Sequence, residues 1–595
     1  MSEKDFLIKY TKGYRLKLVG VIFSVLIYVL ARLARPLVIG FFLDNVIQGL
    51  SVVNPFINNL IELLGGVDFI RSNLWIAFLI LLFCELINFV FTFNRGKLEG
   101  NVAEGMVENI RNDLYQHIQY LPYFFHQDNK AGELVQKCTS DVELVRRFFI
   151  GQFGELTSTI FTTIIAMIIL FNINVQLALI GLIAAPIILI NAVRFFNKMT
   201  KVFLASDEAE GELTNIIQNN LSSIRVVKAF NKERFETERF DKMNQEYVNK
   251  TVKVIRLLGG YFSFSDFICL LQVMAVVIFG AFLSVDGHIT VGDLFVFVSY
   301  ETTIVFSIRM MGRIIADMGK MFVSIKRLVA ILDQKTEDVV SGSTSDLSGD
   351  IVFKDVCFAF ADDQNKNALN NVNLTIAANA TTAIMGPVGS GKSTLMHLLS
   401  RLYDYSAGSI TINDVELNTI SKNHLRKNIG IVLQEPFLFS KSIGENIKIA
   451  NPSANINNIN KAAKIASVHD VINEFDKGYE TIVGEKGVTL SGGQKQRISI
   501  ARVIINEVKI LIFDDSLSAV DSETDKQIRT ALKELAQGIT TILITHRCDS
   551  ASSADKIVVL EDGKVSQEGT HDQLVDQEGF YQRIYQIQTA EKETL

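Results

Sequence analysis

The segment Gly386–Thr394 combines the residue types that bind a chain of phosphates. Its sequence, GPVGSGKST, fits the pattern G-x-x-x-x-G-K-[ST], with Gly386, Gly391, Lys392 and Ser393 at the defining positions. Glycines let backbone N–H groups close around phosphates, the lysine reaches the outer phosphates, and the hydroxyl suits Mg²⁺. The run TTAIM before the segment predicts a strand, and the leucines after it predict a helix whose positive end would face the anion. Together these residues predict a nucleotide-binding P-loop.

A second motif with possible chemistry is VKILIFDDS, residues 508–516. The apolar run from Ile510 to Phe513 predicts a buried strand, which ends at Asp514 and Asp515. Asp514 is placed to hold Mg²⁺ through water, as Walker B aspartates do. A plain core strand followed by surface acids is the alternative, and it is weakened by the P-loop, which requires an acidic partner of this kind.

The third motif is LSGGQKQR, residues 490–497. Alone, SGGQ could be any glycine turn before a helix, but its place between a P-loop and a Walker B strand is specific. With these three motifs the sequence resembles ATP-binding-cassette exporters that fuse a membrane domain and a nucleotide domain in one chain. The resemblance covers essentially the whole sequence.

The resemblance implies roles for further residues. Phe360 in VCFAF would stack on adenine, where such proteins usually carry tyrosine. Gln434 in IVLQEPFLF would sense Mg²⁺ and the membrane domain, and His546 in ILITHR would contact the γ-phosphate. Asp521 in SLSAVD resembles the D-loop aspartate, and Glu485 resembles part of an exporter-specific loop that touches the coupling helices. Two membrane-half segments, FFHQDNKAGELVQKCTSDVELVR and LSSIRVVKAFNKE, resemble the loops that carry those helices.

The resemblance therefore implies a complete site for ATP and Mg²⁺. The residues expected to bind ATP are Phe360, Gly386, Pro387, Val388, Gly389, Ser390, Gly391, Lys392, Ser393, Thr394, Gln434, Ser491, Gly492, Gly493, Gln494, Asp521 and His546. Those expected to act in catalysis are Lys392, Gln434, Asp515 and His546. Mg²⁺ is expected at Ser393, Gln434 and Asp514.

In such exporters two cassettes enclose two ATP molecules, each held by one P-loop and covered by the signature of the other cassette. This sequence has one P-loop and one signature, so the resemblance implies a partner: a second half-transporter. Asp515 stands where most active members place glutamate, whose carboxylate polarises the attacking water. Aspartate is one methylene shorter, and a misplacement of about 1 Å can cost roughly a hundredfold in rate.

Aspartate at this position resembles the subunit of heterodimeric bacterial multidrug exporters that carries a degenerate site and keeps an intact signature. We therefore expect a heterodimer in which ATP on this chain's own P-loop turns over slowly. The alternative is a homodimer in which Asp515 still acts as a base, at a lower rate, because aspartate can serve when the geometry allows.

The first half of the sequence predicts a membrane domain. Six apolar stretches, each near the ~20 residues that cross a bilayer, lie at 17–43, 73–94, 150–172, 176–196, 261–283 and 289–312. We expect a transmembrane exporter domain at 1–332, a polar linker at 333–350 and a nucleotide-binding domain at 351–590. The expected fold class is an α-helical membrane domain with six spans and long cytoplasmic extensions, followed by an α/β P-loop domain.

Lysine and arginine predict the orientation. They gather in the N-terminal tail and in the long segments 95–149 and 197–260, whereas the short loops at 173–175 and 284–288 have none. The positive-inside rule then places both termini and both long loops in the cytoplasm. The loop at 44–72 has helical apolar spacing and predicts either a helix in the outer interface or a lid on the spans.

Charged residues within the spans predict either a polar pathway or internal ion pairs, because charge at membrane depth is costly. They are Arg32, Arg35, Glu85, Glu155, Asp266, Glu301 and Arg309. Aromatic residues of the last two spans would suit apolar cargo, although aromatics in spans also pack together or face lipid. They are Phe262, Phe264, Phe295, Tyr300 and Phe306.

The function expected from these features is ATP-driven export of amphiphilic, multidrug-like small molecules across a plasma membrane. Usage of Asn, Ile and Lys suggests a bacterial source. A net charge of −6 gives no sign of a nucleic-acid partner. Two alternatives are a homodimeric lipid flippase and an ATP-gated channel or regulatory subunit.

Overall fold

The structure is a computed structural model that describes residues 1–52, 61–62, 66–129, 131–360, 367–484, 487, 489–515, 527–528, 530 and 538–593. It divides into two compact units. The first comprises Met1–Gln119 and Lys130–Gln334, and the second comprises Tyr120–Asn129 and Lys335–Leu595. A short segment from the first half of the sequence therefore belongs to the second unit.

The first unit is helical. Its principal described helices are α1 (Glu3–Thr11), α2 (Arg15–Phe41), α4 (Val67–Ser72), α5 (Trp75–Gln119), α7 (Ala131–Gln136), α8 (Val142–Arg147), α9 (Phe153–Ile173), α10 (Val175–Gly181), α11 (Ala184–Ser222), α12 (Ile224–Ala229), α13 (Glu233–Val285) and α14 (Val291–Leu332). Among the described residues, six helical segments are long and apolar enough to cross a membrane, which confirms the predicted number. They are Glu3–Ile47, Trp75–Gln119, Gly132–Ile173, Val175–Phe195, Glu233–Val285 and Val291–Leu332.

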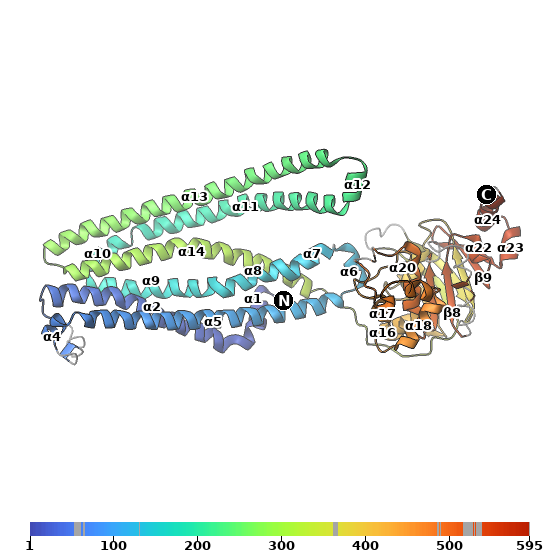
Figure 1. Ribbon diagram of the computed structural model, residues 1–595, viewed down its shortest axis with the longest axis horizontal. Coiled ribbons are helices and arrows are strands. Elements are labelled where there is room, and N and C mark those ends of the chain that lie inside the picture. The colour runs from blue at the N-terminus through green and yellow to red at the C-terminus, as the bar shows by residue number, and fades with distance from the viewer. Residues whose placement is uncertain are drawn as a thin grey trace. The chain divides into compact units, whose positions relative to one another are not determined.

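Several of these helices are much longer than a bilayer requires. At 1.5 Å per residue, a helix of the length of α13 extends about 80 Å, against roughly 30 Å of hydrocarbon. Helices α11 and α13 run side by side and are joined by the short α12 (Figure 1). Much of the polar, helix-forming sequence therefore continues the helices that contain the spans, whereas Tyr120–Asn129 belongs to the second unit. In the 44–72 loop, residues 53–60 and 63–65 lie outside the described residues, while Val46, Ile61 and Ile70 are buried in one cluster with Ile76 of α5.

Close helix packing in this unit is secured where α14 begins. Thr290 and Asp293 form a reciprocal cap at this N-terminus. Asp44, at the end of the first span, accepts hydrogen bonds from the Thr290 hydroxyl at 2.6 Å and the Gly292 backbone N–H at 2.7 Å. A Cβ on Gly292 would lie 2.3 Å from the Gly40 carbonyl oxygen, so glycine is required for this approach. The negative carboxylate at the positive helix end is favourable.

Most of the charged residues predicted within the spans form pairs. Arg35 pairs with Glu85, Arg309 pairs with Asp266, and Glu155 lies 3.1 Å from Arg95. Five of the seven predicted charges thus have a partner inside the first unit, as the ion-pair interpretation expected. Glu301 is fully buried. Arg32 lines a cavity in the same unit.

The second unit contains two sheets. A four-stranded antiparallel sheet has the order β2-β1-β4-β5, formed by β1 (Ile351–Phe358), β2 (Leu369–Ile376), β4 (Ala407–Ile412) and β5 (Val415–Glu416). A six-stranded sheet has the order β10-β9-β3-β8-β7-β6. Its strands are β3 (Thr381–Met385), β6 (Ile429–Val432), β7 (Ile510–Asp514), β8 (Thr540–Ile544), β9 (Lys556–Glu561) and β10 (Lys564–Gly569).

The inner strands of the six-stranded sheet are parallel and nearly continuous in apolar side chains, as strands covered on both faces must be.

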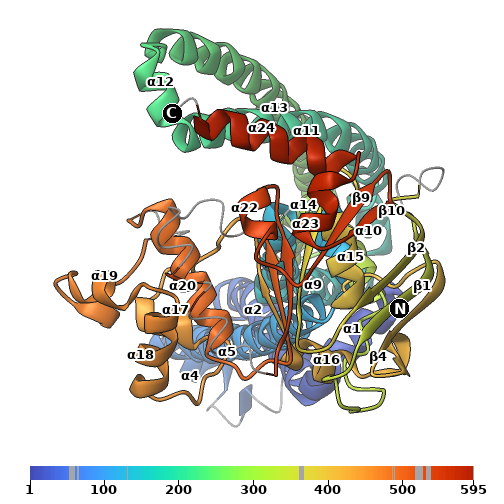
Figure 2. The same cartoon turned by 90° about the vertical axis from the view of Figure 1, so that its right-hand side faces the viewer.

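The second unit also contains helices. Its described α-helices are α6 (Tyr123–Asp128), α15 (Lys392–Leu399), α16 (Lys422–Asn428), α17 (Ile443–Lys448), α18 (Ile456–Ile465), α19 (His469–Asn473), α20 (Gly492–Ile504), α22 (Cys548–Ala551), α23 (His571–Asp576) and α24 (Phe580–Glu593). Figure 2 shows α17, α18 and α20 grouped on one side of the unit and β1, β2 and β4 on the other.

The polar segment predicted as a linker at 333–350 is bound to the second unit for most of its length. The backbone of Val339 accepts a hydrogen bond from Asn423 at 2.8 Å, and Ser343 pairs with Ile420. Glu337 accepts two hydrogen bonds from Arg426 and one from Lys422, all at 2.8 Å. Charged groups with matched geometry thus fix a segment whose composition alone suggested a free connection.

We expect Glu337→Gln to destabilise the second unit by about 2 kcal/mol, because two cations lose a charged acceptor. That loss corresponds to roughly thirtyfold faster amide hydrogen exchange in peptides that contain β3 and β7. The matched control is Glu507→Gln, since the Glu507 side chain is exposed and makes no hydrogen bond among the described residues. Equal exchange in both variants would contradict a stabilising role for Glu337.

This contribution should also depend on pH. Burial opposes ionisation of Glu337, but hydrogen bonds from Arg426 and Lys422 outweigh burial and lower its pKa below the ordinary 4.5. A group with a lowered pKa in the folded state stabilises above its unfolded pKa, and this is lost as pH falls through the folded pKa. The difference between wild type and Glu337→Gln should therefore be full at neutral pH and shrink below about pH 4.5.

Candidate active site

The candidate site lies where neighbouring parallel strands end. β3 pairs with β8, β8 pairs with β7, and β7 pairs with β6, all in parallel. The P-loop follows β3, His546 follows β8, Asp514 and Asp515 end or follow β7, and Gln434 follows β6. Because the carboxyl ends of parallel strands lie at one edge of a sheet, the topology gathers four motifs that are far apart in the sequence.

The P-loop has a backbone that only glycine allows at its critical points. Gly386, Gly389 and Gly391 have φ values of 147°, 81° and 99°. A Cβ on Gly386 would lie 2.1 Å from the Leu560 carbonyl oxygen, and a Cβ on Gly391 would lie 2.8 Å from that of Ala368. Helix α15 begins directly after Gly391, so its free N–H groups open into the loop and form a site for phosphate.

Lys392, the first residue of α15, turns back over the loop. Its side-chain Nζ donates to the carbonyl oxygens of Gly386 at 2.9 Å and Pro387 at 2.7 Å. Burial lowers the pKa of Lys392, and the negative charges of Asp514 and Asp515 offset this only in part. The ammonium is thus held where a phosphate chain would lie, in surroundings where its charge is poorly screened.

Ser393 and Asp514 meet at the next position of the helix. The Ser393 hydroxyl donates to the Asp514 carboxylate at 3.3 Å. A hydroxyl and a carboxylate beside a phosphate site are the oxygen ligands that Mg²⁺ takes together with substrate phosphates. The donor set of this edge therefore fits Mg²⁺. Gln434, the third predicted metal residue, is exposed just beyond β6.

Asp515 and His546 lie beside this pair. The Asp515 backbone N–H donates to Ile544 at 3.0 Å, which ties the end of β7 to the end of β8. Burial raises the pKa of Asp515, against the opposing effect of His546. Burial and Lys392 lower the pKa of His546, while Asp515 and Asp514 raise it. The two groups thus lie within electrostatic reach of each other, and burial disfavours the charged form of both the Asp515 carboxylate and the His546 imidazole.

The backbone at Asp515 adopts a positive φ of 44°. Aspartate and asparagine tolerate this left-handed conformation better than most side chains, because their short polar groups bond locally. Aspartate therefore suits the backbone conformation at position 515.

Phe360 belongs to an aromatic cluster at the edge of the unit. Its ring meets Phe358 edge-on at 5.0 Å and Tyr403 edge-on at 5.5 Å between centroids. Its side chain is 36% exposed, so part of the ring is accessible to a base. Tyr403 also contacts the segment Tyr120–Asn129. Its ring centroid lies 5.7 Å from that of Tyr123, and its hydroxyl donates a hydrogen bond to the Gln127 side chain. The candidate base platform and α6 thus share one tyrosine.

The signature residues form the start of α20. The Ser491 hydroxyl accepts from the Gln494 backbone at 3.3 Å, while the Gln494 side chain accepts from the Ser491 backbone at 2.9 Å. Ser491 and Gly492 are exposed. Among the described residues no hydrogen bond joins Ser491–Gln494 to the P-loop. The helix end is therefore ordered by its own cap and open to an anion from outside.

Comparison with known proteins agrees with this geometry. Residues 18–308 match the model of the ABC transporter transmembrane region, and residues 369–518 match that of the ABC transporter. The Bacillus subtilis protein YwjA, named an uncharacterized ABC transporter ATP-binding protein, is 32% identical over 587 residues, covering 97% of this chain and 98% of its own. The chain belongs to the ATP-binding-cassette (ABC) transporter family. It joins one ABC membrane region to one ABC nucleotide domain and is a multi-pass membrane protein.

Two further relatives refine the comparison. A Staphylococcus aureus (strain NCTC 8325 / PS 47) protein, named as a candidate multidrug export ATP-binding/permease protein, is 31% identical over 585 residues, 98% of this chain and 99% of its own. The solved structure of a bacterial Atm1-family ABC exporter with ATP bound superposes with a TM-score of 0.82 at 24% identity, covering 96% of this chain and 98% of that chain. The chain therefore has the exporter fold, and its ABC domain binds ATP and hydrolyses it in support of transport.

The structure brings together the P-loop, Asp514, Asp515 and His546, and it places Phe360 in the aromatic cluster. Two predicted residues, Asp521 and Glu485, lie outside the described residues. Sequence reasoning missed Tyr403 and Tyr123, which contact each other and link Phe360 to α6. No periodic pattern marks these tyrosines, because their relation exists only through a contact between distant segments.

We expect Tyr403→Ala to weaken ATP binding by roughly three- to tenfold, because each edge-on aromatic pair contributes about 0.5–1.5 kcal/mol and Phe360 loses one. Tyr403→Phe is the matched control: it keeps the ring and loses only the hydroxyl, so its affinity should stay near wild type. Equilibrium ATP titrations of the full chain under non-hydrolysing conditions measure both. An unchanged affinity in Tyr403→Ala would show that Phe360 does not need this support.

Proposed function

We propose that this ABC transporter is one subunit of a heterodimeric exporter that moves amphiphilic small molecules out of a bacterial cell. The export of multidrug-like cargo is supported by the names of relatives such as the Staphylococcus aureus protein. The proposal places residues 1–332 in the plasma membrane domain and 351–590 in a cytoplasmic nucleotide domain, with both termini in the cytoplasm. The contrast between Asp515 and an intact, exposed signature carries the heterodimer assignment.

In the proposed cycle, the P-loop backbone and Lys392 bind the phosphates of ATP, and Phe360 stacks on its base. Ser393, Gln434 and Asp514 would hold Mg²⁺, which when bound would neutralise charge on the phosphates. The exposed N-terminus of α20, with Ser491 and Gly492, covers the ATP held by the partner. Closure of the two cassettes is transmitted to the membrane domains through short helices such as α6.

Hydrolysis requires a carboxylate that takes a proton from the attacking water while His546 contacts the γ-phosphate. Asp515 offers a carboxylate whose basicity is raised by burial, but on a side chain one methylene shorter than glutamate. A displacement of about 1 Å can cost roughly a hundredfold in rate. The shorter side chain of Asp515 should therefore slow hydrolysis more than its raised basicity speeds it. The chain's own site therefore turns over slowly, and its signature completes the faster site of the partner.

We expect Asp515→Glu to raise ATPase activity of the purified chain in lipid by roughly tenfold or more, because the carboxylate regains its reach. The gain is partly offset by the positive φ at this position, which glutamate tolerates less well than aspartate. Phosphate release from wild type and variant, each without a partner subunit, measures the effect.

Asp515→Asn is the matched control, with the size of aspartate and no base. If wild type is nearly inactive, Asp515→Asn should change little. Brisk hydrolysis by wild type that Asp515→Asn abolishes would instead make Asp515 a competent base and favour the homodimer. Lipid-stimulated activity of that homodimer would support the flippase alternative.

A further inference from the structure

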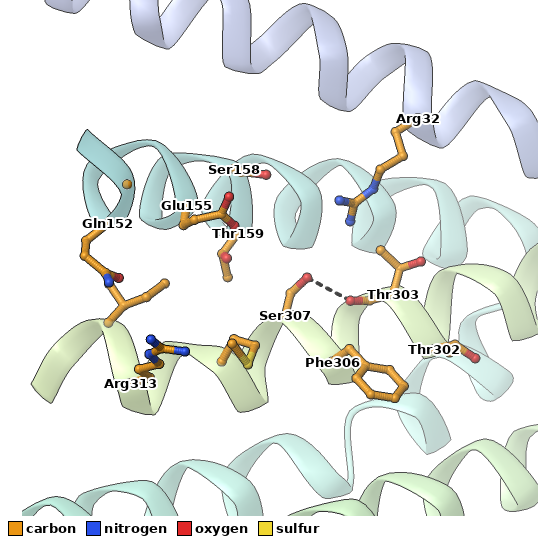
Figure 3. A pocket seen from close by; sticks show the side chains of 13 residues that line it. Arg32, Gln152, Glu155, Ser158, Thr159, Thr302, Thr303, Phe306, Ser307 and Arg313 are labelled. Carbon is orange, nitrogen blue, oxygen red and sulfur yellow. Dashed lines mark hydrogen bonds between the residues drawn. The ribbon is translucent and has the colours of Figure 1, made fainter. Parts of the chain in front are cut away.

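The first unit contains a cavity of about 600 Å³ between α2, α9 and α14 (Figure 3). One side is contributed by Arg32 of α2, which reaches toward the space between the other two helices. The complete lining is Arg32, Gly151, Gln152, Glu155, Ser158, Thr159, Thr302, Thr303, Phe306, Ser307, Met310, Arg313 and Ile314. Of the five aromatic residues predicted to suit apolar cargo, only Phe306 lines this cavity. Tyr300 is fully buried and bonds to the Leu33 carbonyl.

The hydroxyl groups of the lining fall into two sets. On α14, Thr302, Thr303 and Ser307 each donate to the carbonyl four residues earlier, at 2.7–2.8 Å. Their protons are therefore used within the helix. On α9, Ser158 and Thr159 are only 4% and 6% exposed, and neither hydroxyl has a hydrogen-bond partner among the described residues. Both residues line the cavity, so these two hydroxyls are available to a ligand.

The charges of the lining are also unequal. Glu155 is paired with Arg95, and Arg313 is two-thirds exposed with Asp317 one helical turn away at 4.0 Å. The guanidinium of Arg32 has no hydrogen bond or ion pair among the described residues. Arg35, three residues along the same helix, pairs with Glu85. Arg32 is thus a half-buried cation within a predicted span, and its charge is paired with no described residue of its unit. Charges at membrane depth are costly and usually face a cavity or mark a substrate pathway.

We propose that Arg32, with the Ser158 and Thr159 hydroxyls, binds an anionic group of the transported molecule. The cargo class is an acidic amphiphile: a carboxylate, phosphate or sulfonate joined to an apolar body. A guanidinium presents several N–H donors that match the paired oxygens of such groups, and the two hydroxyls can supply further donors. Phe306, Met310 and Ile314 give the same cavity an apolar side for the body of the molecule.

That the bound molecule is the transported one rests on the proposed export function. The anion site itself can be tested by binding alone. The full chain in lipid nanodiscs is titrated, without nucleotide, with a fluorescent long-chain fatty acid and with its methyl ester, and empty nanodiscs serve as the blank. The two probes share the apolar body and differ only in the negative charge. We expect wild type to bind the acid roughly tenfold more tightly than the ester, and an excess of acetate not to displace it.

Three variants locate the charge. Arg32→Gln should reduce the preference for the acid to less than about twofold, and Arg32→Lys should keep part of it, because lysine retains the charge without the planar donor pair. Arg35→Gln removes the same charge from the same helix and should keep the full preference. Equal affinities for acid and ester in wild type, or equal losses in Arg32→Gln and Arg35→Gln, would overturn the assignment. Displacement by acetate would show that the site takes small anions and not amphiphiles.

A second measurement separates this inference from the export function. ATP-driven accumulation of the acid probe in inside-out vesicles is compared between wild type and Arg32→Gln. If vesicles accumulate a cationic or neutral amphiphile while wild type shows no preference for the acid, export stands and the anion site fails. If the acid binds through Arg32 but ATP drives no accumulation, the anion site stands and the export function fails.

Discussion

Parallel pairing of β3, β8, β7 and β6 is the constraint on which the nucleotide chemistry depends. Each strand delivers one motif to the same edge, and the register between strands decides how far apart the motifs lie. The hydrogen bond from the Asp515 backbone to Ile544 is a direct extension of this register beyond the last paired residues. A slip of one residue would exchange the two faces of a strand and remove the carboxylates from the site. The apolar runs that bury these strands are therefore as necessary to the site as the residues that touch ATP.

The membrane unit is governed by a different constraint, the cost of charge in hydrocarbon. Three ion pairs reduce that cost: Arg35 with Glu85, Arg309 with Asp266, and Arg95 with Glu155. Because most charged side chains in the spans are paired, those without a partner among the described residues are candidates for binding a ligand. The Arg32 guanidinium and the Ser158 and Thr159 hydroxyls on α9 differ from these pairs, because none of them has a hydrogen-bond or ion-pair partner among the described residues. A transporter must leave some polar requirements unmet in its interior, because those are the interactions that its cargo can satisfy and that its cycle must later release.

Much of this arrangement could be predicted from the sequence, for identifiable reasons. A span needs an apolar run of fixed length, and a P-loop needs glycine at positions of positive φ, so both leave local patterns such as TTAIM followed by GPVGSGKST. The docking of Glu337 onto Arg426 and Lys422 left no such pattern, because a polar stretch looks the same whether it is free or bound. For the same reason the link from Phe360 through Tyr403 to Tyr123 could not be predicted. Nor could the sequence tell which intramembrane charges pair, since pairing depends on which helix faces turn toward each other.

The separation of the P-loop edge from the start of α20 has a consequence for a transporter built from two different chains. The signature depends on its own cap, Ser491 with Gln494, and on free backbone N–H groups, none of which involves Asp515. The position of Asp515, the proposed base, depends on the end of β7 and on its hydrogen bond to β8. In the proposed heterodimer, a change at residue 515 would therefore alter how fast ATP on this chain is hydrolysed without altering how well this chain covers the ATP of its partner. Each composite site combines the P-loop of one chain with the signature of the other, so the two sites share no residue. In the proposed heterodimer, one site can then keep its ATP bound between the cassettes while the other site hydrolyses ATP. A difference in hydrolysis rate between the two sites needs a change in only one side chain. The positive φ at residue 515 is a backbone conformation that aspartate tolerates well.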